Sequence, residues 1–265
     1  MKKIEEMQKI AIKKLYFLLY EHYGPQGWWP IIELEGHNSN PTNRGEFRGY
    51  HPEDYTIPNN EMQMFEVMLG AILTQNTSWS NAEKALKSLK KNIGFLPKKI
   101  MNTEHEELAE IIRSSGYYNQ KARRLKTLSK YILKHPIRKL NKKKIPALRK
   151  ELLNLKGVGP ETADSMILYG LKKPIFVVDA YSKRLLYRLG ILSSKKANYK
   201  DIQELFHRNI PRDFIVYNEY HALIVQHCAK ICKRSPKCEG CPFLEYCIEE
   251  RRNPPKNKNK AKKKK

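Results

Sequence analysis

The chain has 265 residues, 40% of them hydrophobic, which is enough to bury one large core or two modest ones. Its net charge is +24, and the part before the lysine-rich end at residues 251–265 still carries +15. No apolar run could span a bilayer and the N-terminus lacks a signal-peptide segment, so we expect a cytoplasmic protein, or a nuclear one in a nucleated source, with no membrane contact. The charge favours a polyanionic partner, nucleic acid first, over a surface merely rich in lysine.

Apolar residues recur at helical spacing along most of the chain. The expected helices cover residues 1–23, 61–75, 80–91, 106–113, 120–133, 145–155, 160–170, 181–189, 202–206 and 216–231. Only residues 174–178 (PIFVV) resemble a strand, and residues 31–60 lack periodicity and predict a long loop or irregular insert. Residues 251–265 predict a disordered basic tail. The expected fold is therefore all-α.

The sequence GVGP at residues 157–160 predicts a tight turn between two of these helices. Glycine allows the positive φ that such a turn needs, and proline loses no N–H bond at a first helical position. Glu161 and Thr162 follow in the first helical turn, where a carboxylate is favoured. A helix–hairpin–helix of this kind presents backbone N–H groups to phosphate without reading sequence, although an ordinary helical corner has the same local pattern.

Asp179 stands between the apolar run at residues 174–178 and the helix expected at residues 181–189. Aspartate is a preferred helix N-cap, so a purely structural role is one interpretation. A carboxylate held beside a DNA-binding hairpin could also stabilise positive charge that develops on a sugar. The two roles are compatible.

All five cysteines lie between Cys228 and Cys247, within the last part of the chain. Such clustering in an intracellular chain indicates a metal site rather than a disulfide framework. Four cysteines suit either zinc or a 4Fe-4S cluster, but zinc usually takes two close pairs, and only Cys238 and Cys241 form one.

Several segments resemble the endonuclease III-like helix–hairpin–helix DNA glycosylases. They are LKGVGPETAD (residues 155–164), VVD (177–179), MLGAILTQNT (68–77) and SSGYYNQKARRL (114–125), within a resemblance that covers roughly residues 61–247. GWWP (residues 27–30) together with AILTQNTSW is more particular, and resembles the 3-methyladenine DNA glycosylase III branch. The resemblance implies a two-lobed fold: a six-helix barrel over residues 62–178 that contains the hairpin, and a helical lobe formed by residues 1–61 plus 179–250.

The resemblance implies that Asp179 is the catalytic aspartate, which stabilises the oxocarbenium-like sugar and helps water to attack it. Glu161 stands where bifunctional members carry a Schiff-base lysine. A carboxylate cannot form an imine, so we expect base excision without strand cleavage. Glu161 could equally be a simple partner of the helix dipole.

The base pocket implied by the resemblance comprises Trp28, Trp29, Pro30 and Trp79. Large aromatic faces suit cationic bases such as N3- or N7-methylated purines, which must leave the duplex to be reached. The alternative for these tryptophans is hydrophobic core. Gln75 or Asn76 is expected to fill the gap left by the flipped base.

The remaining implied contacts involve DNA phosphates and an iron–sulfur cluster. The expected DNA-binding residues are Gln75, Asn76, Gly157, Val158, Gly159, Thr162, Lys121, Lys233, Arg234 and Lys237. The expected ligands of a 4Fe-4S cluster are Cys232, Cys238, Cys241 and Cys247; Cys232 is one residue short of the family spacing, and Cys228 is a spare. A monovalent cation at the hairpin turn is a further expectation.

The sequence thus predicts a monomeric, monofunctional DNA glycosylase that excises alkylated purines from damaged double-stranded DNA in base excision repair. One alternative is an endonuclease III-like glycosylase, with or without lyase activity, for oxidised or mismatched bases. Another is a non-catalytic DNA-binding module.

Overall fold

The computed structural model describes residues 2–32, 34 and 49–248, with side chains described from residue 11 onward. Half of the insert expected at residues 31–60, and the tail expected at 251–265, lie outside the described residues. The elements, in chain order, are α1 (Lys2–Tyr23), α2 (Glu61–Leu73), α3 (Trp79–Asn92), α4 (Pro97–Asn102), α5 (His105–Ile111), η1 (Arg113–Ser115), α6 (Tyr118–Lys134), α7 (Ile137–Leu140), α8 (Ile145–Leu153), α9 (Pro160–Ser165), η2 (Met166–Gly170), α10 (Ala180–Arg188), α11 (Tyr199–Asn209), α12 (Phe214–Lys230) and η3 (Leu244–Tyr246).

The all-α prediction is confirmed, because the described residues contain helices and no strand. The expected helices are present with small shifts at their ends, and the short helix expected at residues 202–206 extends over the whole of α11. The apolar run at residues 174–178 is extended backbone that pairs with no strand. Among the described residues, no helix combines the length and the apolar character needed to cross a membrane.

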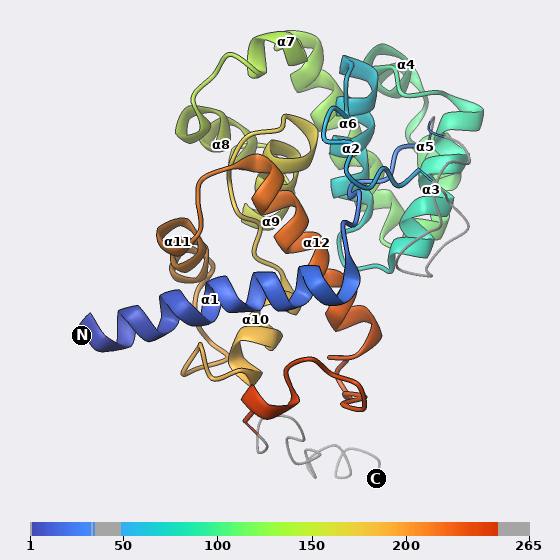
Figure 1. Cartoon of the computed structure of the whole chain (residues 1–265). Helices are drawn as coiled ribbons and strands as arrows, with labels where there is room; N and C mark the ends of the chain where they lie inside the picture. The colour runs from blue at the N-terminus through green and yellow to red at the C-terminus, as the bar shows by residue number, and fades with distance from the viewer. Residues whose placement is uncertain (1, 33, 35–48, 249–265) are drawn as a thin grey trace, which may run out of the picture.

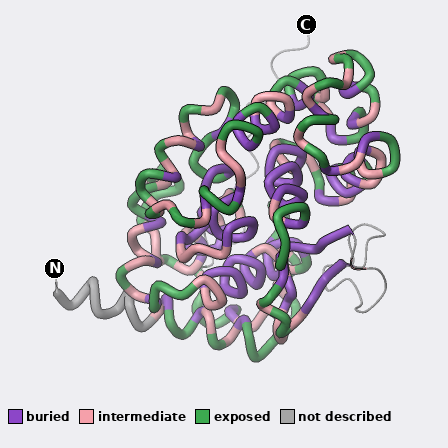
Figure 2. The backbone as a smooth tube through the Cα atoms, turned by 90° about the horizontal axis from the view of Figure 1, so that it is seen from above, coloured by how far each residue is buried: buried purple, intermediate pink, exposed green. Residues whose placement is uncertain are grey.

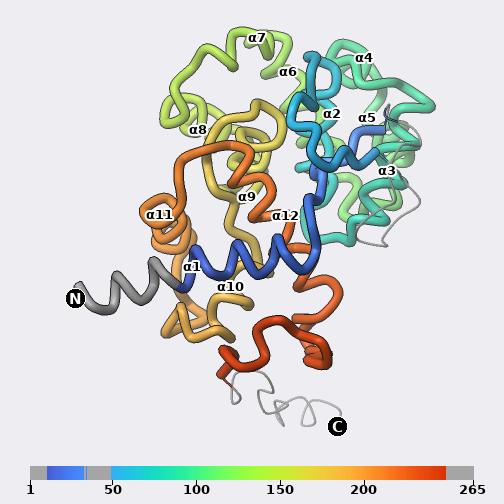
Figure 3. The backbone as a smooth tube through the Cα atoms, in the orientation of Figure 1, coloured from blue at the N-terminus to red at the C-terminus, as the bar shows by residue number. Residues whose placement is uncertain are grey.

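Helix α2 is the centre of the core, with most of its residues buried. Helices α3, α4, α5 and α6 lie on one side of the molecule, while α1, α10 and α11 lie on the other (Figure 1). Helix α12 packs against both α1 and α10 (Figure 3), so helices from the two ends of the described chain lie side by side. The buried residues line the interior between these groups (Figure 2). The division at residues 61/62 and 178/179 stays a prediction.

Several helices begin at a side chain that accepts a backbone N–H of the first turn. Asn60 starts α2, Ser78 starts α3, Asn198 starts α11 and Asp213 starts α12 in this way. Each cap satisfies an N–H that has no acceptor within its helix. These caps fix where the helices start relative to the loops that carry the site.

The second helix of the hairpin is not regular throughout. After α9 it widens into the π turn η2, whose five residues are all buried. Gly170 ends this turn against α2, where an added Cβ would lie 3.3 Å from the carbonyl oxygen of Met64. Such π turns occur frequently at functional sites.

Candidate active site

The hairpin turn joins α8 to α9 as the glycines predict. Gly157 has φ +88°, in the left-handed region that glycine adopts without strain. The N–H of Val158 donates to the carbonyl of Leu155 at 3.0 Å, and the Val158 side chain is buried. Gly159 is the extended N-cap of α9. The start of α9 at Gly159, Pro160 and Glu161 is therefore exposed to solvent, as a phosphate site would require. The cation expected at this turn stays a prediction.

Gln75 connects the end of α2 to the hairpin. Its Nε2 donates to the carbonyl of Gly157 at 3.0 Å and to Oγ1 of the buried Thr162 at 2.9 Å, while its Oε1 accepts a bond from Arg124. Asn76 is exposed and has φ +52°, a conformation that asparagine tolerates better than most residues. Gln75 is thus engaged within the protein, and Asn76 has the free side chain.

Lys121 was expected on the polar face of α6, among the DNA-binding residues. The structure corrects this, because Lys121 is fully buried and its Nζ donates to the carbonyls of Leu73 at 2.8 Å and Ser115 at 2.6 Å. Burial lowers the pKa of Lys121 to about 8, and Arg124 adds to the effect. The lysine holds the ends of two neighbouring segments together and does not reach DNA.

Asp179 is the N-cap of α10, as its position predicts. Its Oδ1 accepts two hydrogen bonds from Ser182, from the backbone N–H at 2.7 Å and from the hydroxyl at 2.8 Å. Its Oδ2 takes no part in the cap and lies 3.8 Å from Nε2 of His221. The carboxylate is 12% exposed, so one oxygen fixes the helix while the other faces the interior of the site.

His221 and Tyr169 are site residues that sequence reasoning missed. The hydroxyl of Tyr169 is hydrogen-bonded to Nδ1 of His221, and both residues are buried. Burial lowers the pKa of His221 although the Asp179 charge opposes the shift, so the imidazole is neutral. A row of three groups, Tyr169, His221 and Asp179, results. The signal available in the sequence was weak, because α12 contains several other polar residues, among them Glu219 and His227.

Glu161 lies near Asp179 on the first turn of α9. Its pKa is raised to about 7, first by desolvation and then by the Asp179 carboxylate, while Lys183 opposes the shift. The residue is nevertheless exposed, so solvent screens part of these interactions. A carboxylate with this pKa can hold or release a proton near neutral pH.

Asp164 supports the segment that leads to Asp179. It is completely buried and accepts hydrogen bonds from Arg149 at 2.6 Å and 3.1 Å, from Tyr199 at 2.7 Å and from Gln203 at 2.7 Å. Gln203 also donates to the carbonyl of Phe176 at 2.6 Å. This network joins α8, α9 and α11 to the extended run before Asp179. It was not predicted, because its members are far apart in the chain.

The three tryptophans meet in one aromatic cluster with Tyr169. The ring centroids of Trp28 lie 4.9 Å from those of Trp29 and Trp79, and Tyr169 lies 5.6 Å from Trp29. Trp29 is 6% and Trp79 is 9% exposed, and the Nε1 atoms of both are buried without a hydrogen-bond partner. The buried Pro30 follows them. The cluster is thus part of the core and also reaches Asp179 through Tyr169 and His221.

A buried carboxylate positions the segment before the tryptophans. Glu219 of α12 accepts the backbone N–H of Gln26 at 2.9 Å and that of Gly27 at 3.4 Å. Burial raises the pKa of Glu219, and these two bonds oppose the shift. The loop that carries Trp28 is therefore tied to the same helix as His221.

The four expected cluster ligands line one cavity between α10 and the loop after α12. Cys232, Cys238, Cys241 and Cys247 share it with apolar residues such as Ile231, Phe243 and Leu244. Cys228 is not among its lining residues; its thiol points to the carbonyl of Tyr181 at 3.6 Å. The neighbouring Cys228 thiol, followed by Arg188, lowers the pKa of Cys232 to about 6, and burial opposes the shift.

Arg188 holds the cysteine loop from α10. Its guanidinium donates to Sγ of Cys232 at 3.1 Å and to the carbonyls of Lys233 at 2.7 Å and Arg234 at 2.9 Å. The side chains of Lys233, Arg234 and Lys237 are exposed, whereas Arg188 is 4% exposed. The buried arginine thus fixes a loop whose basic side chains face solvent.

An all-helical fold that sets a capped aspartate beside a helix–hairpin–helix turn defines the class of the helix–hairpin–helix DNA glycosylases. Residues 69–212, more than half of the chain, match the HhH-GPD superfamily of base excision DNA repair proteins, so the chain belongs to this superfamily.

Individual relatives agree with this assignment. The chain is 42% identical over 242 residues to a provisionally assigned DNA repair glycosylase of Methanocaldococcus jannaschii, covering 89% of this chain and 96% of that one. It is 30% identical over 188 residues to endonuclease III of Thermotoga maritima, with 71% and 84% coverage. The solved H. pylori 3-methyladenine DNA glycosylase bound to 1,N6-ethenoadenine superposes with a TM-score of 0.59, at 28% identity and 83% and 96% coverage.

Proposed function

We propose that this DNA glycosylase is monofunctional and excises alkylated purines from duplex DNA. The observation that carries the proposal is the continuous row from the tryptophan cluster through Tyr169 and His221 to Oδ2 of Asp179. It joins a surface suited to an extruded base with a carboxylate suited to the sugar of the same nucleotide. To excise a base from a duplex, the enzyme must bind the extruded base and place the carboxylate near the sugar of the same nucleotide.

The aromatic cluster supports a cationic purine as the substrate base. Indole faces attract cations, and bases stack on them without regard to sequence. The unpartnered Nε1 donors of Trp29 and Trp79 are costly in the free protein, by about 1–3 kcal/mol each, and a base that offers an acceptor would satisfy them. The H. pylori relative with its bound ethenoadenine is consistent with a purine.

In the proposed reaction, water attacks C1′ of the sugar while the glycosidic bond breaks, and the base leaves with the bonding electrons. For a purine methylated at N3 or N7, those electrons neutralise the charge on the base, so no proton has to be delivered to it. Oδ2 of Asp179 stabilises the positive charge on the sugar. The proton that water releases passes to a carboxylate, and the pKa of about 7 suits Glu161 to take it.

His221 acts as a positioning residue for Asp179. As a neutral imidazole, whose hydrogen bond to Tyr169 occupies Nδ1, it presents Nε2 toward Oδ2. A neutral neighbour leaves the negative charge of Asp179 available to the sugar, whereas an imidazolium would neutralise it. Asn76, exposed at the end of α2, is the side chain we assign to the gap left by the flipped base.

The cysteine cavity supports a 4Fe-4S cluster as a resident cofactor. A single zinc ion draws its four sulfurs to within about 4 Å of one another. Four thiols line one cavity, and only two of them, Cys238 and Cys241, are separated by two residues, a spacing that favours a cubane over a zinc site built from two close pairs. Cys232, Cys238, Cys241 and Cys247 would hold it, and bound there it would fix the loop that presents Lys233, Arg234 and Lys237 to phosphate.

The function is tested with duplexes that each carry one lesion, incubated with protein and then treated with hot alkali. Excision of methylated purines supports the proposal, and activity restricted to oxidised pyrimidines refutes it. Asp179→Asn keeps the shape and the cap but removes the negative charge, so excision should fall about 10²–10³-fold while affinity for undamaged DNA is retained. Asp201→Asn, at an exposed carboxylate in the first turn of α11, is the matched control.

A second candidate function is combined glycosylase and lyase activity through Lys183. This lysine lies one turn into α10 and is near enough to Glu161 to lower its pKa. Borohydride trapping separates the two functions: a monofunctional enzyme forms no covalent adduct. An adduct that persists in Glu161→Gln but disappears in Lys183→Gln would establish the lyase.

A further inference from the structure

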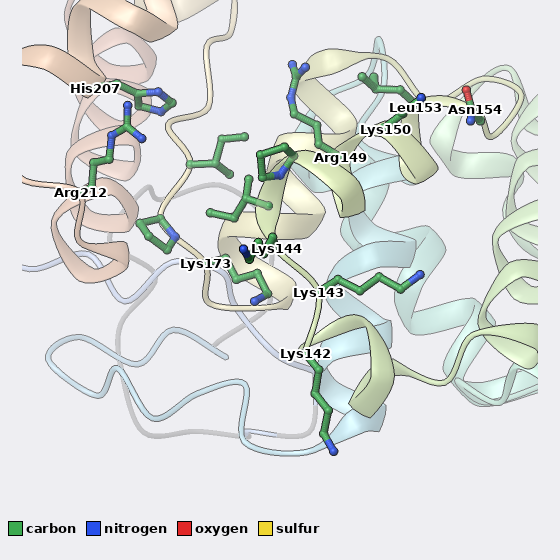
Figure 4. A pocket seen from close by; sticks show the side chains of 14 residues that line it. Lys142, Lys143, Lys144, Arg149, Lys150, Leu153, Asn154, Lys173, His207 and Arg212 are labelled. Atoms are coloured by element: carbon green, nitrogen blue, oxygen red, sulfur yellow. The ribbon is translucent and has the colours of Figure 1, made fainter.

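A second strongly basic region lies away from the tryptophan cluster. Its walls are α8 with the turn before it, the extended residues 173–175, and the end of α11 with the following turn. They enclose an open cavity of about 920 Å³. We call it the basic groove; its cationic lining consists of Lys142, Lys143, Lys144, Arg149, Lys150, Lys173 and Arg212. In Figure 4, His207 and Arg212 lie on one side, Arg149 and Lys150 on the other, and Lys144 and Lys173 between them.

The positive charge of the basic groove is only partly neutralised. Lys143 binds Glu151 at 2.6 Å, and Arg149 binds the buried Asp164 at 2.6 Å. Within the described residues, the other five lysine and arginine side chains form no ion pair; they are Lys142, Lys144, Lys150, Lys173 and Arg212. Five like charges around one cavity repel one another, and an anion would relieve that repulsion.

The lining also indicates what kind of anion fits. It contains no phenylalanine, tyrosine or tryptophan, and the one aromatic ring of the lining, His207, is stacked on Tyr217 with ring centroids 5.6 Å apart. Lysines dominate, and they contact phosphate as flexible point charges without reading sequence. The groove is therefore suited to a phosphate backbone and not to bases.

The position of the groove connects it to the hairpin. Leu153 and Asn154 line its end, directly before the turn at residues 155–159. Helix α8 with Asn154 extends over about 14 Å, which corresponds to about four phosphates of one strand. A strand that passes the hairpin can thus continue along α8.

We propose that the basic groove is an accessory phosphate-backbone site, which binds DNA beyond the segment held at Asp179 and lengthens the footprint of the enzyme. This inference rests on the proposed function only in taking DNA as the partner. The basic groove would account for part of the positive charge that lies outside residues 251–265, and it is a different surface from the loop that carries Lys233, Arg234 and Lys237.

The test compares two triple variants with equal loss of charge. Lys144→Gln, Lys150→Gln and Lys173→Gln alter the groove, whereas the exposed lysines of the control, Lys84→Gln, Lys91→Gln and Lys98→Gln, lie on α3 and α4. Binding of undamaged duplexes of about 10 and about 30 base pairs is measured across a salt series. Undamaged DNA keeps the binding result independent of which lesion is excised. Excision is followed in parallel on a duplex of the short length that carries one N-methylated purine.

For the long duplex, the groove variant should bind at least about tenfold more weakly, and its slope of log K against log salt should shrink by up to about 2.7. The groove variant should bind the short duplex, and excise the lesion from its damaged counterpart, as well as the unaltered protein does. The control variant should change neither binding nor excision. Arg212→Gln alone should reduce the slope by about 0.9. Equal losses in both triples, or none in the groove variant, overturn the proposal. So does loss of tripolyphosphate binding with unchanged affinity for the long duplex, which would indicate a small polyphosphate ligand.

Discussion

Replacing Glu161 with glutamine should change stability in a strongly pH-dependent way. The folded protein raises the pKa of this carboxyl from 4.5 to about 7, so the folded state binds more protons than the unfolded state between these values. The charged carboxylate therefore destabilises the fold as pH rises through this window. Below pH about 4.5 the group is protonated in both states and contributes nothing.

The size of the effect follows from the shift and the exposure. One pKa unit corresponds to 1.36 kcal/mol, so a shift of this size would give at most about 3 kcal/mol. Because Glu161 is exposed, solvent screening reduces the expected gain of Glu161→Gln at pH 8 to about 1 kcal/mol. At pH 5 the gain should nearly vanish.

Urea unfolding followed by circular dichroism at pH 5 and pH 8 measures this difference. Glu107→Gln, at an exposed site on α5, is the matched control and should show no dependence on pH. An equal gain at both pH values, or a loss at pH 8, would show that Glu161 is not held in a desolvated, negatively charged environment. The proposed proton acceptor would then have to be Asp179 alone.

Three further changes test the supports of the site. Asp164→Asn leaves buried donors without their anion, so stability should fall by about 3 kcal/mol and excision should slow, whereas Glu204→Gln, at an exposed ion pair of α11, should change neither. Lys121→Met should cost about 2 kcal/mol at pH 7 in urea unfolding, because two carbonyls lose their donor. This difference in stability should grow between pH 8 and 10.5, because the wild-type lysine loses its proton at a lower pH in the folded state than in the unfolded state. A difference that stays constant over this range argues against a depressed pKa of Lys121. Arg188→Gln should lower the iron bound per chain and the visible absorbance of purified protein, and full retention of iron would show that its bond to Cys232 does not support the cluster.

The local features of the fold could be predicted because neighbouring residues determine them. The glycines at 157 and 159 with Pro160 define a turn before a helix, and Asp179 is followed by a helix that it caps. Periodicity located the long helices. It missed short α4 and α7, which contain too few turns to show a pattern.

For Lys121, the helical spacing and the charge of the side chain predict opposite locations. It lies four residues before Leu125, which is followed by Leu128 and Ile132, so all four fall on the buried stripe of α6. The spacing therefore placed the lysine inside, although its charge suggested the surface. Two carbonyl acceptors make that burial tolerable, and their presence depends on how α2 and η1 end.

The contacts that complete the site could not be read from the sequence. His221 lies 52 residues from Tyr169, and Gln203 lies 39 residues from Asp164. Each pair forms only when separate helices pack, and no local rule relates their positions. The basic groove likewise combines segments that are unremarkable by themselves.

The division of the Asp179 carboxylate between a helix cap and the interior of the site has a consequence for preorganisation. Its two bonds to Ser182 fix the side chain before any DNA arrives, so binding energy is not needed to orient it. The same bonds limit evolutionary change: a glutamate would carry the charge one methylene farther and lose the cap, while serine or threonine would keep the cap and lose the charge. In the proposed mechanism, the catalytic charge and the start of α10 therefore depend on the same side chain.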